Sequence, residues 1–425
     1  IMAKARAGIK LRDGRSLETT LIDLRAKSRD EFEAVRMLLG QDKDLKRMFL
    51  EIPVSLYASD PNWIRPLDQD IEFIFDPNKN SHLKKGEAIR WILFDENQNP
   101  IGRVAAFYEN TEPDKSNLKM AGMGFFEVID DKNAAIILFD ACKHWLKEKG
   151  FEGMDGPINF GERDSFWGLM IKGWEFEPTY KMPWTKPYYI SFFENYGFKD
   201  YFQQYVYVSS IQGANVTAGI EEKAQRIYQN PNYNFKHIEK ANLAKYAEDF
   251  KIIYNAAWAK FPGVSEMTSE QAQKLVKQMK PIIDEQLLWF AYSELDEPVA
   301  FFIVIPDLNQ IIKHLHGKLN TWGKIKFLLL KSRGALTRTC GLIFGVVPEH
   351  QGKGVESAIA LRFRTAAREN PFYPYTTMDM NWVGDFNPKM MRFVSQLGAT
   401  NDKTFITYRY LFNPNQPFSR CPKVG

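Results

Sequence analysis

The chain has 425 residues, of which 44% are hydrophobic and 25% are charged, with a net charge of +4 and three cysteines. This length exceeds what one hydrophobic core usually organises, so we expect two domains, and the ordinary composition excludes disordered, fibrous and disulfide-stapled classes. The weak charge argues against a nucleic-acid binder, the cysteine spacing predicts no metal site, and the lack of a roughly 18-residue apolar stretch or a secretion signal predicts a cytoplasmic protein.

The first half of the chain alternates strands with helices. Residues 1–16 are basic and turn-rich, and we expect them to be a loose tail or an expression remnant outside the fold. The clearest helix starts at the N-cap Asp131 and ends at Gly150, with apolar residues at three- and four-residue spacing that should face a sheet. The other predicted elements are strands at 21–25, 90–95, 102–108 and 124–129 and a helix at 30–39.

The second half repeats this order after a soft stretch at 209–215, which we take as a linker. We therefore expect a first lobe at 17–212 and a second lobe at 213–425, each a mixed α/β sheet flanked by helices, related by duplication. The last strand should close the sheet of the second half. The predicted elements are strands at 235–238, 287–293, 299–305, 342–347 and 405–411, and helices at 243–260, from 269, at 355–369 and at 387–398.

The segment 347–356 joins a strand to a helix through a turn that contains Gly352 and Gly354. Several backbone N–H groups should converge there, at the positive end of the helix dipole, and Lys353 adds a nearby cation. Glycines let a diphosphate approach the backbone. The segment therefore predicts an anion cradle, with an ordinary strand-to-helix turn as the alternative.

Residues 351–354 resemble the acyl-CoA-binding signature of the GNAT superfamily of N-acyltransferases, and Glu356 departs from it where a small residue is expected. The stretch 387–399 resembles the last helix of that family, and 188–198 is a similar ending in the first lobe. The first-lobe stretches 156–169 and 182–189 resemble uncharacterised bacterial two-lobed GNAT-like proteins. The resemblance to the GNAT superfamily implies acetyl-CoA or another acyl-CoA as cofactor. It implies cofactor contacts from Val346, Val347, Gln351, Gly352, Lys353, Gly354, Val355 and Asn387.

The resemblance specifies the reaction less closely than the fold. Many GNAT enzymes protonate the departing thiolate with a tyrosine, but the matching positions here are Phe193 and Val394, which cannot donate a proton. Tyr408 and Tyr410 are candidates by residue type, and His350 because it neighbours the loop and titrates near neutrality. The thioester carbonyl should lie near the strand at 342–347, where a strand splayed from its neighbour exposes a backbone N–H.

The first lobe carries a different signal. Its strand-to-helix junction at 126–133 has no glycine and has Asp130 and Asp131 where a phosphate would lie, so this lobe should not bind CoA. The stretches 156–169 and 182–189 mix polar and aromatic residues, which is the composition of a ligand cleft or of an Ω-type loop closed by an Arg163 ion pair. The candidate cleft residues are Asn159, Glu162, Arg163, Asp164, Trp167, Tyr188 and Tyr189.

Residues 311–338 contain seven Lys or Arg and no acid, interleaved with leucines and aromatics. This basic insert is either a solvated helical face or a binding surface for CoA phosphates, an anionic substrate or lipid headgroups. Three functions remain open: an acyl-CoA-dependent N-acyltransferase for a small-molecule or peptide amine, a CoA-binding protein or sensor without turnover, and an aminoacyl or peptidyl transferase of the tandem-GNAT type.

Overall fold

The computed structural model describes residues 3–10, 16–21, 32–95, 97–110, 118–213, 216–258 and 266–424, with side chains from residue 43 onward except that of Trp258. The first half supplies strands β1 (Ala3–Lys10), β2 (Ser16–Leu21), β3 (Gly86–Phe94), β4 (Pro100–Glu109), β5 (Met120–Val128), β6 (Gly153–Gly156), β7 (Leu169–Lys172) and β8 (Lys199–Ser210). Its helices are α1 (Phe32–Leu56), α2 (Asp68–Ile74), α3 (Lys132–Glu148) and α4 (Tyr189–Tyr196).

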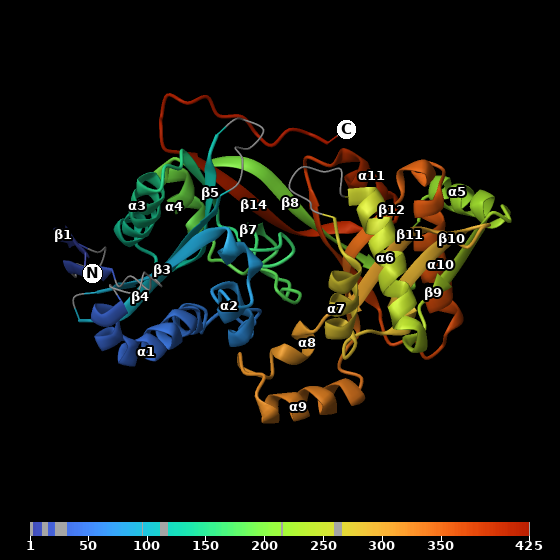
Figure 1. The fold of residues 1–425 in the computed structure, drawn as a ribbon, viewed down its shortest axis with the longest axis horizontal. Coiled ribbons are helices and arrows are strands. Elements are labelled where there is room, and N and C mark those ends of the chain that lie inside the picture. Colours follow the sequence, from blue (N-terminus) through green and yellow to red (C-terminus); the bar gives the residue numbers. More distant parts are fainter. Residues whose placement is uncertain are drawn as a thin grey trace.

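The second half repeats the pattern. Its strands are β9 (Tyr233–His237), β10 (Leu288–Ser293), β11 (Pro298–Pro306), β12 (Arg338–Val346), β13 (Thr377–Gly384) and β14 (Thr400–Leu411). Its helices are α5 (Ala218–Tyr228), α6 (Leu243–Trp258), α7 (Ser269–Met279), α8 (Asn309–Ile312), α9 (Thr321–Ser332), α10 (Val355–Glu369) and α11 (Pro388–Gln396). The predicted mixed α/β class is confirmed, and helices cover both sides of the sheet (Figure 1).

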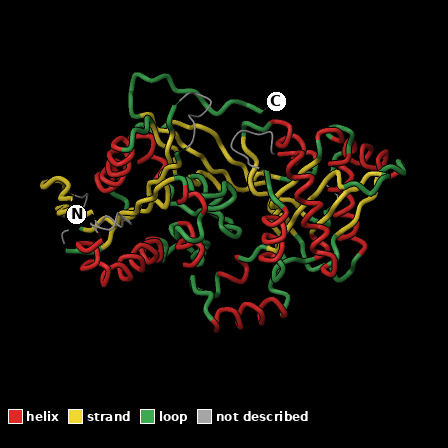
Figure 2. The backbone as a smooth tube through the Cα atoms, viewed as in Figure 1, coloured by secondary structure: helices red, strands yellow, loops and turns green. Residues whose placement is uncertain are grey.

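One 12-stranded sheet runs through both halves in the order β3-β4-β5-β6-β14-β8-β13-β12-β11-β10-β9, with β7 paired to β14. Figure 2 shows these strands as a continuous band across the molecule. Strand β14 lies against β6 of the first half, and β8 lies against β13 of the second half. Each half of the chain therefore donates a strand to the other half's part of the sheet.

This exchange of strands corrects the prediction that the last strand closes the second half alone. Tyr408 of β14 pairs with Gly156 of β6, and the Arg409 guanidinium makes two hydrogen bonds to the Asp155 carboxylate, at 2.7 and 2.8 Å. Two parallel charge-assisted bonds fix this strand to the first half. The C-terminal part of β14 is thus a first-half strand in structural terms.

Two other predictions are corrected at the ends of elements. Residues 3–10, predicted as a tail, form β1 and pair antiparallel with β2. The sequence carried a signal for this, because Lys4 and Arg6 alternate with alanines, which is a strand pattern. The predicted linker at 209–215 begins inside β8, which continues to Ser210. Of the strand predicted at 21–25, only Leu21 lies within the described residues.

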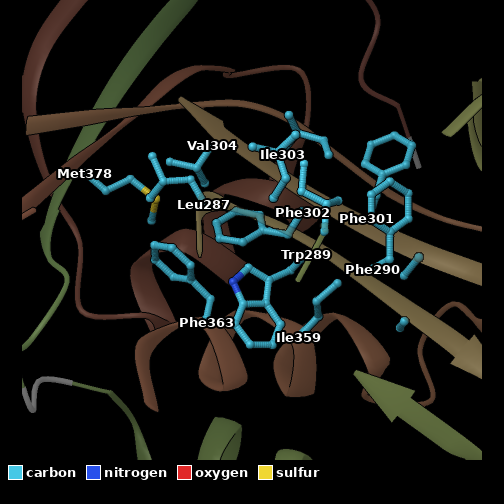
Figure 3. Close-up of a cluster of buried hydrophobic side chains, with 14 of the residues drawn as sticks. Leu287, Trp289, Phe290, Phe301, Phe302, Ile303, Val304, Ile359, Phe363 and Met378 are labelled. Carbon is cyan, nitrogen blue, oxygen red and sulfur yellow. The ribbon is translucent and has the colours of Figure 1, made fainter. Parts of the chain in front are cut away.

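The second-half core holds α10 rigidly under the sheet. Phe302 of β11 and Phe363 of α10 meet edge to face with ring centroids 5.4 Å apart, and Trp289, Phe290 and Ile359 are buried in the same cluster (Figure 3). Truncating a buried phenylalanine usually costs about 3–5 kcal/mol. This packing fixes the helix whose N-terminus follows the glycine loop.

None of the helices that the structure describes is both long enough and apolar enough to cross a bilayer.

Candidate functional site

The glycine loop, residues 347–354, connects β12 to α10 and contains two residues with left-handed backbone. After the short 3₁₀ turn Pro348–His350, Gly352 has φ +71° and Gly354 has φ +102°. A side chain is strained at such angles, which explains why glycine stands at both places. A Cβ at Gly352 would meet no atom within 4 Å, so this side of the turn opens to space.

The amides of the loop are available for an external acceptor. Among the described groups, none accepts a hydrogen bond from the N–H of residues 352–355, and the N-cap Gly354 has no side chain to cap α10. The Gln351 side chain donates instead to the Val346 carbonyl, 2.9 Å away, and ties the loop to its strand. An uncapped helix N-terminus with adjacent amides is a typical anion site.

Glu356 lies in the first turn of α10 and does not fill the cradle. One of its carboxylate oxygens, Oε2, is buried and has no hydrogen-bond partner among the described atoms. The carboxylate therefore does not satisfy the loop amides, although its charge stands close to where a bound anion would lie.

Two other predicted site residues have structural partners. His350 Nδ1 is 2.7 Å from the Tyr233 hydroxyl, and burial followed by the charge of Lys353 lowers the pKa of this histidine. The Asn387 side chain accepts from the Met390 N–H at 3.1 Å and caps α11. Val346, Val347 and Val355 are buried beside the loop.

The strands β12 and β13 separate in the middle of the sheet. Their parallel pairing runs from Arg338 with Thr377 to Gly341 with Met380 and then stops, although β12 continues to Val346 and β13 to Gly384. The register of β13 with β8 also shifts between Met380 and Val383. Backbone groups of 342–346 on that edge therefore lack a partner in β13, as the predicted splay requires.

Three of the predicted cleft residues lie beside β13, which they reach from the first half. Arg163, Asp164 and Trp167 line a recess with Asn381 and Trp382 of β13, with ≈ 280 Å³ of space outside protein atoms, including open solvent. We call it the junction recess. The Trp382 indole donates to the Arg163 carbonyl at 2.8 Å, so the loop is fixed to the second-half strand.

The ion pair offered as the alternative for this loop does not form. Among the described residues no salt bridge joins Arg163 to Glu162 or Asp164; the Arg163 guanidinium lies 5.6 Å from the Trp167 ring centre. Asp164 accepts a hydrogen bond from the Ser165 hydroxyl at 2.9 Å. Two charged side chains thus lie at the junction recess without neutralising each other.

The remaining predicted cleft residues are spread more widely. Asn159 is buried and donates to the Glu162 carbonyl. The pKa of Tyr254 in α6 is raised, mainly by the burial of its hydroxyl and then by the charge of Glu162. Tyr188 donates to the Val128 carbonyl at 2.8 Å, and Tyr189 is buried in the first-half core. These two tyrosines support the end of β5 and do not line the junction recess.

A second recess, which the sequence did not predict, lies within the first half. It encloses ≈ 750 Å³ of space outside protein atoms, including open solvent, and shares Met182 and Pro183 with the junction recess. Most of its wall is apolar, and we call it the first-lobe recess. Among its lining residues are Leu50, Trp63, Ile64, Ile71, Phe125 and Trp184.

One polar part of that wall is a buried network around Glu127. The Tyr57 and Tyr189 hydroxyls donate to Glu127 Oε2 at 2.5 and 3.0 Å, and Arg103 lies 3.6 Å from Oε1. Burial raises the pKa of Glu127, against the opposing effects of Arg103 and the two hydroxyls. An acid inside a predicted apolar strand was the available signal, and it was missed.

Tyr408 and Tyr410 lie away from the glycine loop. Tyr408 is buried against Phe193 and donates to Glu194 at 3.2 Å, and the Tyr410 hydroxyl accepts from Lys143 at 2.9 Å. Both follow β14 into the first half, so the strand exchange removes them as proton donors at the loop. No group of metal-ligating side chains occurs among the described residues.

No known protein-family model matches the chain. It is 27% identical over 388 residues to Protein YghO of Escherichia coli strain K12, covering 88% of this chain and 94% of that protein. It is also 27% identical over 372 residues to the bacterial ceramide synthase of Caulobacter vibrioides, covering 86% and 94%.

Two solved structures share the architecture. A tandem GNAT protein from the clavulanic acid biosynthesis pathway matches 94% of this chain and 100% of its own, at 10% identity and a TM-score of 0.53. A GCN5-related glucosamine N-acetyltransferase region of a fungal multi-domain protein matches 93% of this chain, which spans 38% of that one, at 13% identity and a TM-score of 0.51. These likenesses show the fold and specify no acceptor. The chain has the fold of the tandem GNAT proteins.

Proposed function

We propose that this protein is an acyl-CoA-dependent N-acyltransferase that holds its cofactor in the second half and receives its amine acceptor from the first. The observation that carries the proposal is the splay of β12 from β13, with the glycine loop at the end of β12 and the junction recess beside β13. In this arrangement the diphosphate of CoA would meet the free amides of residues 352–355.

The chemistry needs little covalent help from the protein. An acyl-CoA supplies a thioester, and unpaired N–H groups of 342–346 can stabilise the oxygen that becomes negative when an amine attacks. A C–N bond forms, the C–S bond breaks, and the amine proton must leave. Asp164 is a carboxylate on the wall of the junction recess, so we assign it the proton, while solvent protonates the thiolate.

We further propose a long-chain amine as the acceptor. The relative named as a ceramide synthase supports this, because a ceramide is a long-chain amine carrying an N-acyl group. The apolar first-lobe recess adjoins the junction recess through Met182 and Pro183 and suits an aliphatic chain. The Glu127 carboxylate in its wall already has protein partners, so the recess favours the aliphatic chain of the acceptor over the amino group.

Two measurements on the purified protein test this function. Thermal unfolding with CoA and acyl-CoA tests binding, and release of free thiol tests turnover with a long-chain 2-amino alcohol, ethanolamine or an amino acid as acceptor. We expect stabilisation, and thiol release that requires the long-chain amine. Asp164→Asn should lower kcat and leave the CoA stabilisation unchanged.

The other outcomes select the alternatives. Stabilisation by CoA without thiol release from any amine would contradict turnover and favour a CoA-binding protein or sensor, which the displacement of Tyr408 and Tyr410 from the loop also favours. Transfer from an aminoacyl donor in the absence of CoA would favour an aminoacyl or peptidyl transferase. No stabilisation by any CoA species would contradict both uses of the loop.

A further inference from the structure

The helix α9 presents a large apolar face to solvent. It forms the lower edge of the molecule, away from the sheet (Figure 1). Its outward residues are large and apolar, while Phe327 and Leu330 pack inward against the core. The outward set and its exposed fractions are Trp322 78%, Ile325 51%, Leu328 65% and Leu329 46%.

Cations border this face on both sides. At about 100° per residue, Lys324 and Lys331 fall on one flank of the exposed stripe, and Lys326 and Arg333 on the other. Each pair is two turns apart, so each flank carries a row. The helix thus has an inner apolar face, an outer apolar face and two rows of positive charge between them.

The positive charge is not neutralised from within. Of the seven cations in 311–338, only two form salt bridges with described carboxylates. Lys313 pairs with Glu177, and Arg338 pairs with Asp307 and Glu177. Lys326 and Lys331 donate to the carbonyls of His314 and Pro281, which leaves their charge uncompensated. These two bonds and the Asn320 N-cap fix the helix in this orientation.

We propose that α9 docks with its outer face on an anionic phospholipid membrane. An exposed tryptophan and leucines bordered by lysines match the boundary between acyl chains and charged headgroups, where apolar side chains enter and cations meet lipid phosphates. A second copy of this chain fits the face less well, because a symmetric contact would bring the same rows of cations together.

The docking face lies close to the first-lobe recess. The loop between α8 and α9 is bound to its rim, because the Gly317 carbonyl accepts from the Asp68 N–H at 2.8 Å, and Asp68 and Arg65 line the recess. A chain leaving the bilayer beneath α9 would be near the site proposed for the acceptor. That consequence rests on the proposed function, whereas docking itself does not.

Flotation with lipid vesicles tests the docking without any enzyme assay. We expect the full chain to float with vesicles of phosphatidylglycerol and phosphatidylcholine, weakly with phosphatidylcholine alone, and less as salt rises. Lys324→Gln and Arg333→Gln should each weaken partitioning roughly fivefold. Trp322→Asp with Leu328→Asp should abolish it, while thermal stability and CoA stabilisation stay unchanged.

The control is Phe372→Asp, which places one such charge at an exposed apolar residue outside α9, with 89% exposure. It should float like the unsubstituted protein. Equal flotation of the α9 variants and the control would overturn the proposal. So would a dimer in solution that dissociates on Trp322→Asp with no vesicle binding, because the face would then bind a second copy.

Discussion

The two strand-to-helix junctions of this molecule occupy equivalent places in the element order and treat their helix N-termini in opposite ways. After β5, Asp131 accepts hydrogen bonds from the N–H groups of Asn133 and Ala134 at 2.8 and 3.0 Å, so a carboxylate of the chain occupies the end of α3. After β12, Gly354 leaves the end of α10 without a side-chain cap. The first helix carries its own anion, and the second leaves room for another.

The difference shows how one fold can keep a helix end for structure or for a ligand. A carboxylate cap stabilises a helix by about 1–2 kcal/mol, which an open terminus forgoes. The second half compensates with the buried aromatic packing of α10. Substitutions that interchange the two kinds of junction should therefore separate stability from cofactor binding.

The largest effect is expected from Gly354→Asp, which gives the second junction the residue type of the first. An L residue at φ +102° is strained, its Cβ would lie 3.4 Å from the Ile227 side chain, and a carboxylate would compete for the loop amides. CoA should no longer raise the unfolding temperature. Gly334→Asp is the control, since it has φ +75° and nothing within 4 Å, and it should keep CoA stabilisation.

Asp131→Ala removes the side-chain cap at the first junction. Loss of both cap bonds should lower the free energy of unfolding by about 1–2 kcal/mol in urea titration, and the shift produced by CoA should stay the same. A weakened CoA shift would mean that the first junction takes part in cofactor binding and would contradict the assignment of CoA to the second half.

Glu356→Gln sharpens the contrast on a smaller scale. Removing one negative charge beside the cradle should tighten CoA binding roughly fivefold, measured by titration calorimetry. Glu369→Gln at the other end of the same helix should have no effect on affinity. If Glu356→Gln weakens CoA binding, the carboxylate contributes to the site instead of opposing it.

The smallest expected effect is a pH dependence at His350. Its pKa is lowered in the folded protein, so its contribution to stability is present above the unfolded pKa of about 6.5 and is lost as pH falls through the folded value. Unfolding measured from pH 7 to 5 should lose less stability in His350→Gln than in the unsubstituted protein. Bound CoA should reduce the loss, because a diphosphate favours the protonated ring.

Local signals predicted much of this molecule. The α10 range, the Asp131 cap of α3, the Asn387 cap of α11 and both hairpins follow from side-chain periodicity and capping chemistry over a few residues. The splay was expected from the family resemblance. A few neighbouring residues in the sequence cannot reveal which strand will pair with a given strand. The alternating pattern of β14 would be the same beside any neighbour.

That limit explains the errors at the site. Tyr408 and Tyr410 were candidates by residue type alone, and the pairing of β14 with β6 places them in the first half. The acid inside the strand marked Glu127 as unusual, but nothing in its own segment reveals its partner Tyr57, which donates to it across 70 residues of sequence. In contrast, the Arg163 loop was selected on composition alone, and the structure brings it to the splayed strand.

The exchange of β8 and β14 makes the protein equivalent to a domain-swapped dimer whose two subunits are fused into one polypeptide. Neither half of the chain supplies all the strands of its own part of the sheet. A chain cleaved after Gly213 should remain assembled through these swapped strands until it unfolds, and the two halves should lose their structure together.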